Sequence, residues 1–120
     1  MIREKGIFFR ISALYKEGMS ARELYETTRG VWRIGKRREK AEYAFCVYKN
    51  EIIEVYRILQ WYPAGTLPYD TRSRESVDIE GRWEFEGEVA DSKVRSQYIG
   101  RSVEDYISKG AINPVIYVNC

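Results

Sequence analysis

The chain has 120 residues, enough for one domain that buries a hydrophobic core without a metal or a disulfide. It contains no histidine, which excludes a Ser-His-Asp or Cys-His catalytic pair, a histidine general base and zinc sites built on imidazole. Its net charge of +2 is too small for a protein whose whole surface binds nucleic acid, so any basic binding surface must be local.

The N-terminal quarter predicts a strand followed by a helix. Apolar residues alternate with others from Gly6 to Ser12, a pattern typical of a strand. Ser20 and Glu23 have the spacing of a capping box, which begins a short helix, and Gly30 is well placed to end it.

A basic segment, Thr27 to Arg38, follows this helix. It has five positive charges, no acid, and Trp32 in its middle. We expect a short strand from Val31 to Ile34, with its apolar residues turned inward and the arginines turned to solvent. Cations contact phosphates and an aromatic ring can stack on a base, so the segment is a candidate grip for a phosphate-bearing ligand. A solvated charged face is the alternative interpretation.

The middle of the chain predicts a hairpin. Tyr43 to Tyr48 reads as a strand in which Cys46 is a small buried hydrophobe, and Lys49-Asn50 makes a tight turn. Ile52 to Trp61 reads as a long strand whose apolar positions change parity. A bulge near Tyr56-Arg57 would explain that change.

A long loop and an alternating strand come next. Tyr62 to Gly81 contains prolines, glycines and a polar run, which indicates a long, mobile loop. Arg82 to Ala90 then alternates between an apolar face and a face carrying Glu84, Glu86 and Glu88. This pattern predicts an antiparallel strand with its glutamates in water.

The C-terminal quarter predicts two short helices and a strand. Asp91 is placed to cap the first helix, and Ser102 begins a second capping-box pattern. Val115 to Val118 reads as the last strand. The whole chain, residues 1–120, therefore reads as one α+β domain: a small bent or closed antiparallel β-barrel of about six strands with about three short helices.

Several motifs carry a resemblance to known proteins. They are the run Leu24 to Gly35, which contains Gly-Val-Trp, the segments Ala41 to Phe45 and Ile53 to Ile58, and the ending Asn113 to Asn119. Together they resemble a family of small prokaryotic proteins of unknown function. More distantly, the layout is similar to PUA-like domains, which include the ASCH and EVE/YTH families.

The resemblance implies a single PUA-like domain that binds RNA or modified nucleic acid without catalysis. Trp32 and Trp61 would then flank an aromatic pocket, and four arginines would form its basic rim. The predicted nucleic-acid-binding set is Thr28, Arg29, Gly30, Trp32, Arg33, Arg37, Arg38 and Trp61. A core position is the alternative for both tryptophans.

Two other functions stay open. An enzyme that acts on nucleotides or nucleic acid could use Glu84 or Glu54 with a divalent metal, since paired carboxylates can hold Mg²⁺ or transfer protons. A protein-interaction module could use the surface of a chain with ten tyrosines.

The remaining expectations concern cofactors, partners and location. There is no P-loop or G-x-G-x-x-G motif, so we expect no cofactor, and the two cysteines form no metal motif. We expect nucleic acid as the partner, no membrane contact and a cytoplasmic, reducing location. The oligomeric state is left open.

Overall fold

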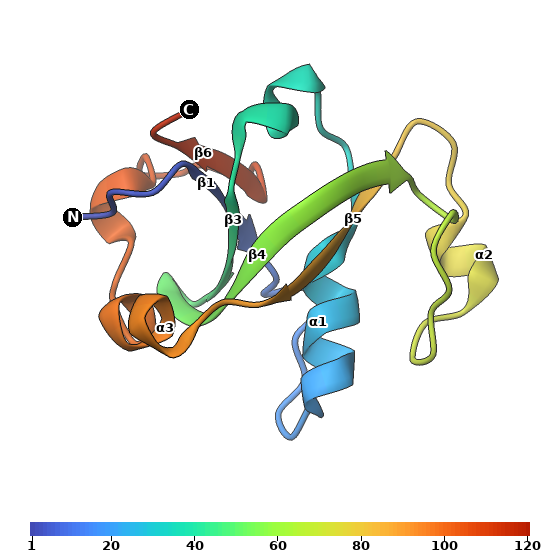
Figure 1. Cartoon of the computed structure of the whole chain (residues 1–120), viewed down its shortest axis with the longest axis horizontal. Helices are drawn as coiled ribbons and strands as arrows, with labels where there is room; N and C mark the ends of the chain where they lie inside the picture. The colour runs from blue at the N-terminus through green and yellow to red at the C-terminus, as the bar shows by residue number, and fades with distance from the viewer.

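Six strands form one strongly curled sheet, a half-barrel, in the computed structural model, which describes all residues 1–120 (Figure 1). Across the sheet the order is β2-β5-β4-β3-β1-β6. The strands are β1 (Gly6–Arg10), β2 (Gly30–Trp32), β3 (Tyr43–Tyr48), β4 (Glu51–Pro63), β5 (Trp83–Val89) and β6 (Val115–Val118). The α+β class with a bent sheet is confirmed, and the sheet is open, with β2 and β6 as its edges.

One strand pair departs from the antiparallel sheet that the sequence predicts. β1 runs parallel to β3, with Phe8 opposite Phe45, whereas every other pair is antiparallel. Between them the chain forms α1 (Ala21–Arg29) and then β2 at the far edge of the sheet. Periodicity within a strand shows which residues face the core, but it does not show the direction of the neighbouring strand.

Both faces of the sheet are covered, which explains the uninterrupted apolar run in β1. Phe8 and Phe45 pack on one face against α3 (Ser92–Tyr98), which contributes Val94 and Tyr98. Ile7 and Phe9 point to the other face, the side of α1. Figure 1 shows α1 and α3 on different sides of the curled sheet. Strands buried on both faces read as continuous hydrophobic runs.

The helices agree in part with the sequence. The Ser20 capping box is formed as predicted, and Asp91 caps α3 by accepting a hydrogen bond from the Val94 amide. The predicted helix after Ser102 is only a 3₁₀ turn, η2 (Glu104–Tyr106), and a second 3₁₀ turn, η1 (Lys36–Lys40), follows β2. The remaining α-helix, α2 (Arg74–Val77), lies inside the segment predicted as a loop.

The long strand β4 is bent by two irregularities. Its register shifts against β3 around Ile53 and against β5 around Leu59, on either side of the predicted bulge at Tyr56-Arg57. Such bulges bend a strand and increase its twist. Tyr56 and Arg57 keep regular pairing with both neighbouring strands, so the predicted position of the bulge is wrong. The parity change arises because Val55 and Ile58 pack in core clusters on opposite faces of the sheet. No helix is long and apolar enough to cross a bilayer.

Candidate nucleic-acid interface

The two predicted pocket tryptophans belong to the core. Trp32 and Trp61 are each 6% exposed. The Trp32 ring stacks on Phe9 with centroids 4.9 Å apart, and its Nε1 donates to the carbonyl oxygen of Thr28 at 2.8 Å. Trp61 packs edge-on against Phe85 at 5.3 Å, and its buried Nε1 has no hydrogen-bond partner. Phe9 lies between the two indoles, so the three rings form one aromatic cluster on the α1 face of the sheet.

Two of the four predicted rim arginines are buried, whereas the sequence pattern predicted that they face solvent. The Arg29 guanidinium lies 4.2 Å from the centre of the Tyr69 ring and donates to the carbonyl oxygen of Pro68. Arg38 lies 3.5 Å from the centre of the Trp83 ring. Guanidinium groups are weakly hydrated and stack well on aromatic faces, which is why charged residues can occupy these sites.

The other two rim arginines are exposed. Arg37 lies 4.3 Å from the centre of the Tyr117 ring and donates through Nε to the carbonyl oxygen of Cys120 at 2.8 Å. Arg33 has no hydrogen bond or ion pair within the chain. Of the predicted rim, Arg33 is therefore the side chain most available to a ligand.

Thr28 and Gly30 have local roles. The Thr28 hydroxyl donates to the carbonyl oxygen of Leu24 at 2.8 Å. A Cβ on Gly30 would come within 2.5 Å of the Tyr69 hydroxyl and 3.0 Å of Glu84 Cβ. Glycine at this position therefore lets the loop pack directly onto the start of β2.

A pocket of about 650 Å³ opens beside β2, and we call it the arginine pocket. Its cations are Arg33, Arg72 and Arg82, and no carboxylate lines it. Val31 and Trp32 contribute apolar surface from β2, and Ile79, Leu14 and Ile112 contribute it from three separate loops. The structure thus brings Trp32 and Arg33 together with two arginines that the sequence analysis did not select.

Arg72 and Arg82 each donate to a backbone carbonyl of β2, and Arg72 donates to one of α1 as well. Arg72 donates through Nη1 to the carbonyl oxygens of Gly30 at 2.6 Å and Glu26 at 3.1 Å. Arg82 Nη1 donates to the Val31 carbonyl oxygen at 3.4 Å. Neither forms an ion pair with a carboxylate. A guanidinium has five N–H donors, so both keep donors for a ligand while their positions are fixed.

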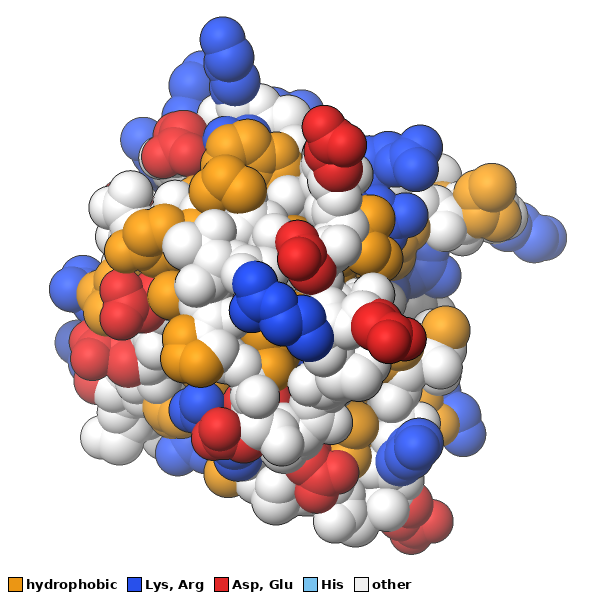
Figure 2. Space-filling model, turned by 90° about the vertical axis from the view of Figure 1, so that its right-hand side faces the viewer, with side chains coloured by type: hydrophobic (Ala, Val, Ile, Leu, Met, Phe, Trp, Pro, Cys, Tyr) orange, Lys and Arg blue, Asp and Glu red, His pale blue; other side chains and the backbone are white.

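Electrostatics at the pocket favours an anion. Burial lowers the pKa of the Arg72 guanidinium, because the charged form loses hydration. A bound anion would offset that loss. Figure 2, which faces the side of the molecule that carries α2, shows basic, acidic and apolar side chains intermixed and no continuous basic face. The cationic surface is local, as the small net charge requires.

The loop that leads to Arg72 is held by the buried carboxylate of Glu84, which the sequence pattern predicted to be exposed to solvent. Glu84 is 0% exposed, whereas the alternation of β5 predicted a solvated side chain. Its oxygens accept hydrogen bonds from the amides of Gly65 and Leu67 and from the Tyr69 hydroxyl, which lies 2.8 Å away. The loop after β4 folds over this end of β5, so the wet face of an isolated strand becomes an interior position.

A second buried carboxylate holds the next part of the same loop. Glu26 of α1 is 0% exposed and accepts hydrogen bonds from the amides of Asp70 and Thr71 and from the Thr71 hydroxyl. Burial raises its pKa, but these hydrogen bonds and the nearby Arg22 charge outweigh that effect, and the net pKa is lowered. Arg22 lies one helical turn away, and this spacing is the only sequence signal that marks Glu26.

The carboxylates proposed for the metal-dependent alternative are occupied in other ways. Glu54 forms a two-pronged ion pair with Arg95, at 2.8 and 3.0 Å. Glu84 is satisfied by the loop described above. No group of three or more histidine, cysteine, aspartate or glutamate side chains lies close enough together to hold a metal ion.

Comparison with other proteins adds no family to this picture: no family, curated protein or solved structure matches the chain.

Proposed function

We propose that this protein is a non-catalytic nucleic-acid-binding domain that takes RNA or a modified base at the arginine pocket. The observation that carries the proposal is the grouping of Arg33, Arg72 and Arg82 around one concavity with no carboxylate among the lining residues. Arginine can bind a phosphate group with several N–H donors at once. The resemblance to PUA-like domains supports the same function, and the half-barrel sheet is consistent with it.

The pocket combines two kinds of surface that a nucleotide needs. Its arginines offer donors to phosphate oxygens, and Val31, Trp32 and Ile79 offer apolar surface to a base. Its volume of about 650 Å³ is in the range of sites that enclose a small ligand. One nucleotide of a strand is such a ligand.

The residues predicted from sequence take different roles in this proposal. Arg33 contacts the nucleic acid directly, and Trp32 forms the inner wall of the pocket. Arg37 extends the cationic surface along the exposed turn η1. Arg29 and Arg38, stacked on Tyr69 and Trp83, support the loop and the turn rather than the ligand.

Fluorescence anisotropy with labelled RNA and single-stranded DNA tests the proposal. We expect binding at ~50 mM salt that weakens steeply as salt rises. Arg33→Ala should lower affinity by about 5-fold or more and reduce the salt slope by about 0.7, because one phosphate contact to a single strand is lost. Lys93→Ala, an exposed cation on α3 outside the pocket, is the matched control and should leave binding unchanged.

Two results would contradict the proposed function. No binding of either polymer at ~50 mM salt would refute the proposed function, since phosphate contacts are strongest there. Equal losses for Arg33→Ala and Lys93→Ala would show diffuse charge attraction and no site at the pocket.

A further inference from the structure

Three concavities share lining residues with one another. The arginine pocket shares Ile112 and Pro114 with a second hollow of about 350 Å³. The second hollow shares Arg10 and Ala111 with a third, of about 390 Å³. The loop between η2 and β6 contributes to all three, so they form a series of neighbouring hollows around that loop.

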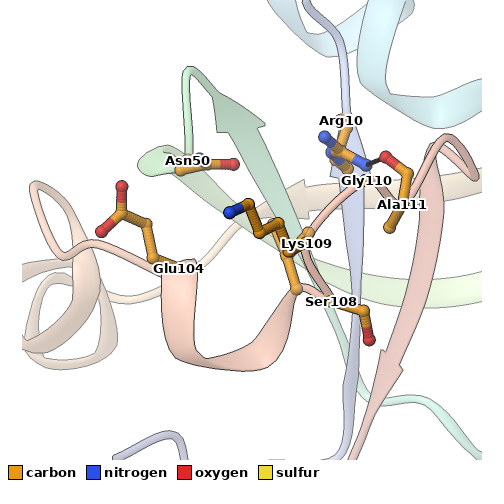
Figure 3. A pocket seen from close by; sticks show the side chains of 8 residues that line it. Arg10, Asn50, Glu104, Ser108, Lys109, Gly110 and Ala111 are labelled. Carbon is orange, nitrogen blue, oxygen red and sulfur yellow. Dashed lines mark hydrogen bonds between the residues drawn. The ribbon is translucent and has the colours of Figure 1, made fainter.

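Positive charge continues along the series. Arg10 lines the second and third hollows, and Lys109 lines the third (Figure 3). Arg10 is fixed through Nη1, which donates to the carbonyl oxygens of Ala111 at 3.0 Å and Asn113 at 3.3 Å. The Lys109 ammonium forms no ion pair. Glu104, in the third hollow, is the one carboxylate in the series.

Exposed apolar side chains line the same series of hollows. Ile112 is 95% exposed where the first and second hollows meet. Leu14 and Ile79, 43% and 39% exposed, line the first hollow. Exposed apolar groups gathered beside concavities mark contact surfaces, whereas single scattered ones need no explanation.

From these observations we infer that the series of hollows is the track of a single strand of nucleic acid. The strand extends from the arginine pocket, past Ile112, to the hollow with Arg10 and Lys109. The hollows have the size of sites for small ligands, which gives the track a length of about three nucleotides, one for each hollow. Phosphates meet the cations and bases lie against Ile112, Leu14 and Ile79, the combination that sequence-tolerant single-strand binders use.

This inference rests on the proposed function but makes a separate prediction about strand length. A ligand of about two nucleotides fills the arginine pocket without reaching Lys109, and a longer one reaches both ends. Arg33 and Lys109 lie at opposite ends of the series, and both are exposed, so either can be replaced without disturbing the core. Lys93 again supplies the matched control.

The experiment measures anisotropy for labelled single strands from about two to about eight nucleotides, a span that brackets the track. We expect affinity to rise with length and to level off once the three hollows are filled. Arg33→Ala should weaken all lengths. Lys109→Ala should leave the shortest strands unchanged, weaken the longer ones by about 3-fold or more, and reduce their salt slope by about 0.7. Ile112→Asp should weaken strands of every length, because Ile112 lines both the arginine pocket and the second hollow.

Three other results would contradict the track, the proposed function or both. If Arg33→Ala weakens binding but Lys109→Ala has no effect at any length, the pocket binds nucleic acid and the track is wrong. If a duplex competes as well as the single strand, the track is also wrong. If the wild type binds no strand of any length, both the track and the proposed function fail.

Discussion

Two of the three loops that line the arginine pocket are held in different ways. The segment from Ala64 to Arg82, which includes α2, is fastened from inside by the carboxylates of Glu84 and Glu26. The segment from Ile107 to Pro114 is held nearer the surface. The Arg10 side chain donates to the carbonyl oxygens of Ala111 and Asn113, the Arg10 amide donates to the Pro114 carbonyl oxygen, and the Ala111 amide donates to the Ser108 carbonyl oxygen in a short turn.

This difference shows what decides the order of a long loop. Both loops are rich in turn-forming residues, and composition alone predicts mobility for the longer one. Its amides nevertheless find buried acceptors, and a buried carboxylate that accepts several hydrogen bonds is costly to leave unpaired. The first loop therefore holds Arg72 ready for a ligand, and the second presents Ile112 and Lys109 on a more weakly fixed segment.

The most damaging change to this arrangement should be Glu84→Ala. It leaves the Gly65 and Leu67 amides and the Tyr69 hydroxyl without their acceptor and opens a gap beside β5. We expect a loss of about 3 kcal/mol in the free energy of unfolding, measured by urea denaturation, because several charge-assisted hydrogen bonds are lost together. Glu86→Ala, on the exposed part of the same strand, should change it by less than about 0.5 kcal/mol. Equal effects would contradict the buried role of Glu84.

The second effect should appear in acid and depend on Glu26. Its folded pKa is lowered below the ordinary value of 4.5, so the stability it contributes is fully present above pH 4.5 and is lost as pH falls through the folded pKa. Glu26→Gln should cost about 2 kcal/mol near neutral pH, because the amide nitrogen then faces backbone donors. The unfolding free energies of variant and wild type should converge as pH falls below 4.5. A constant difference across that range would contradict this account.

A smaller effect is expected from Arg10→Ala, which removes the side-chain hydrogen bonds to the segment from Ile107 to Pro114. Two hydrogen bonds near the surface are lost, and we expect about 1 kcal/mol in unfolding free energy. Hydrogen exchange should quicken at the Ala111 amide, while the Gly65 and Leu67 amides stay protected. Arg3→Ala, an exposed cation whose side chain makes no hydrogen bond, is the control. If exchange quickens equally in both loops, they are not held independently.

The finest test separates local loosening from global unfolding by means of the two thiols. Burial raises the pKa of the Cys46 thiol to about 12, so it stays protonated and unreactive near pH 8. A disulfide reagent should therefore label only the half-buried Cys120 in the folded protein, and Cys46 only after urea is added. The same single labelling in Arg10→Ala would show that only the loop was released. Labelling of Cys46 in the native wild type would contradict its core position.

The elements with strong local patterns were predictable. The bounds of β3 and β6 match the predicted segments, the Ser20 capping box and the Asp91 cap are formed, and the turn at Lys49-Asn50 has the positive φ angles of a tight hairpin. Each of these depends on residues that are close in sequence. The helix predicted after Ser102 became a 3₁₀ turn, because capping residues can start a helix but only packing extends it.

The site depended on contacts that no local pattern contains. The local pattern predicts a solvated Glu84, but the loop from Gly65 to Tyr69 covers this side chain in the structure. The local pattern also predicts a ligand contact at Arg29, but the Arg29 guanidinium stacks on the Tyr69 ring. Arg72 and Arg82 gain their positions from carbonyls along β2, more than forty residues earlier in the chain. Trp32 lies beside cations in the structure, and one of those cations, Arg72, comes from the loop that the sequence alone describes as mobile.

The sequence by itself determined the α+β class, most strands, the local basic segment and the absence of imidazole chemistry, because these follow from composition and from periodicity over a few residues. Only the tertiary structure decided the parallel pairing of β1 with β3, the burial of Glu26 and Glu84, and the grouping of arginines around one pocket. The physical reason is that a charge or an edge of a strand has no fixed environment until distant segments pack on it, and that environment determines whether a side chain supports the fold or meets a ligand.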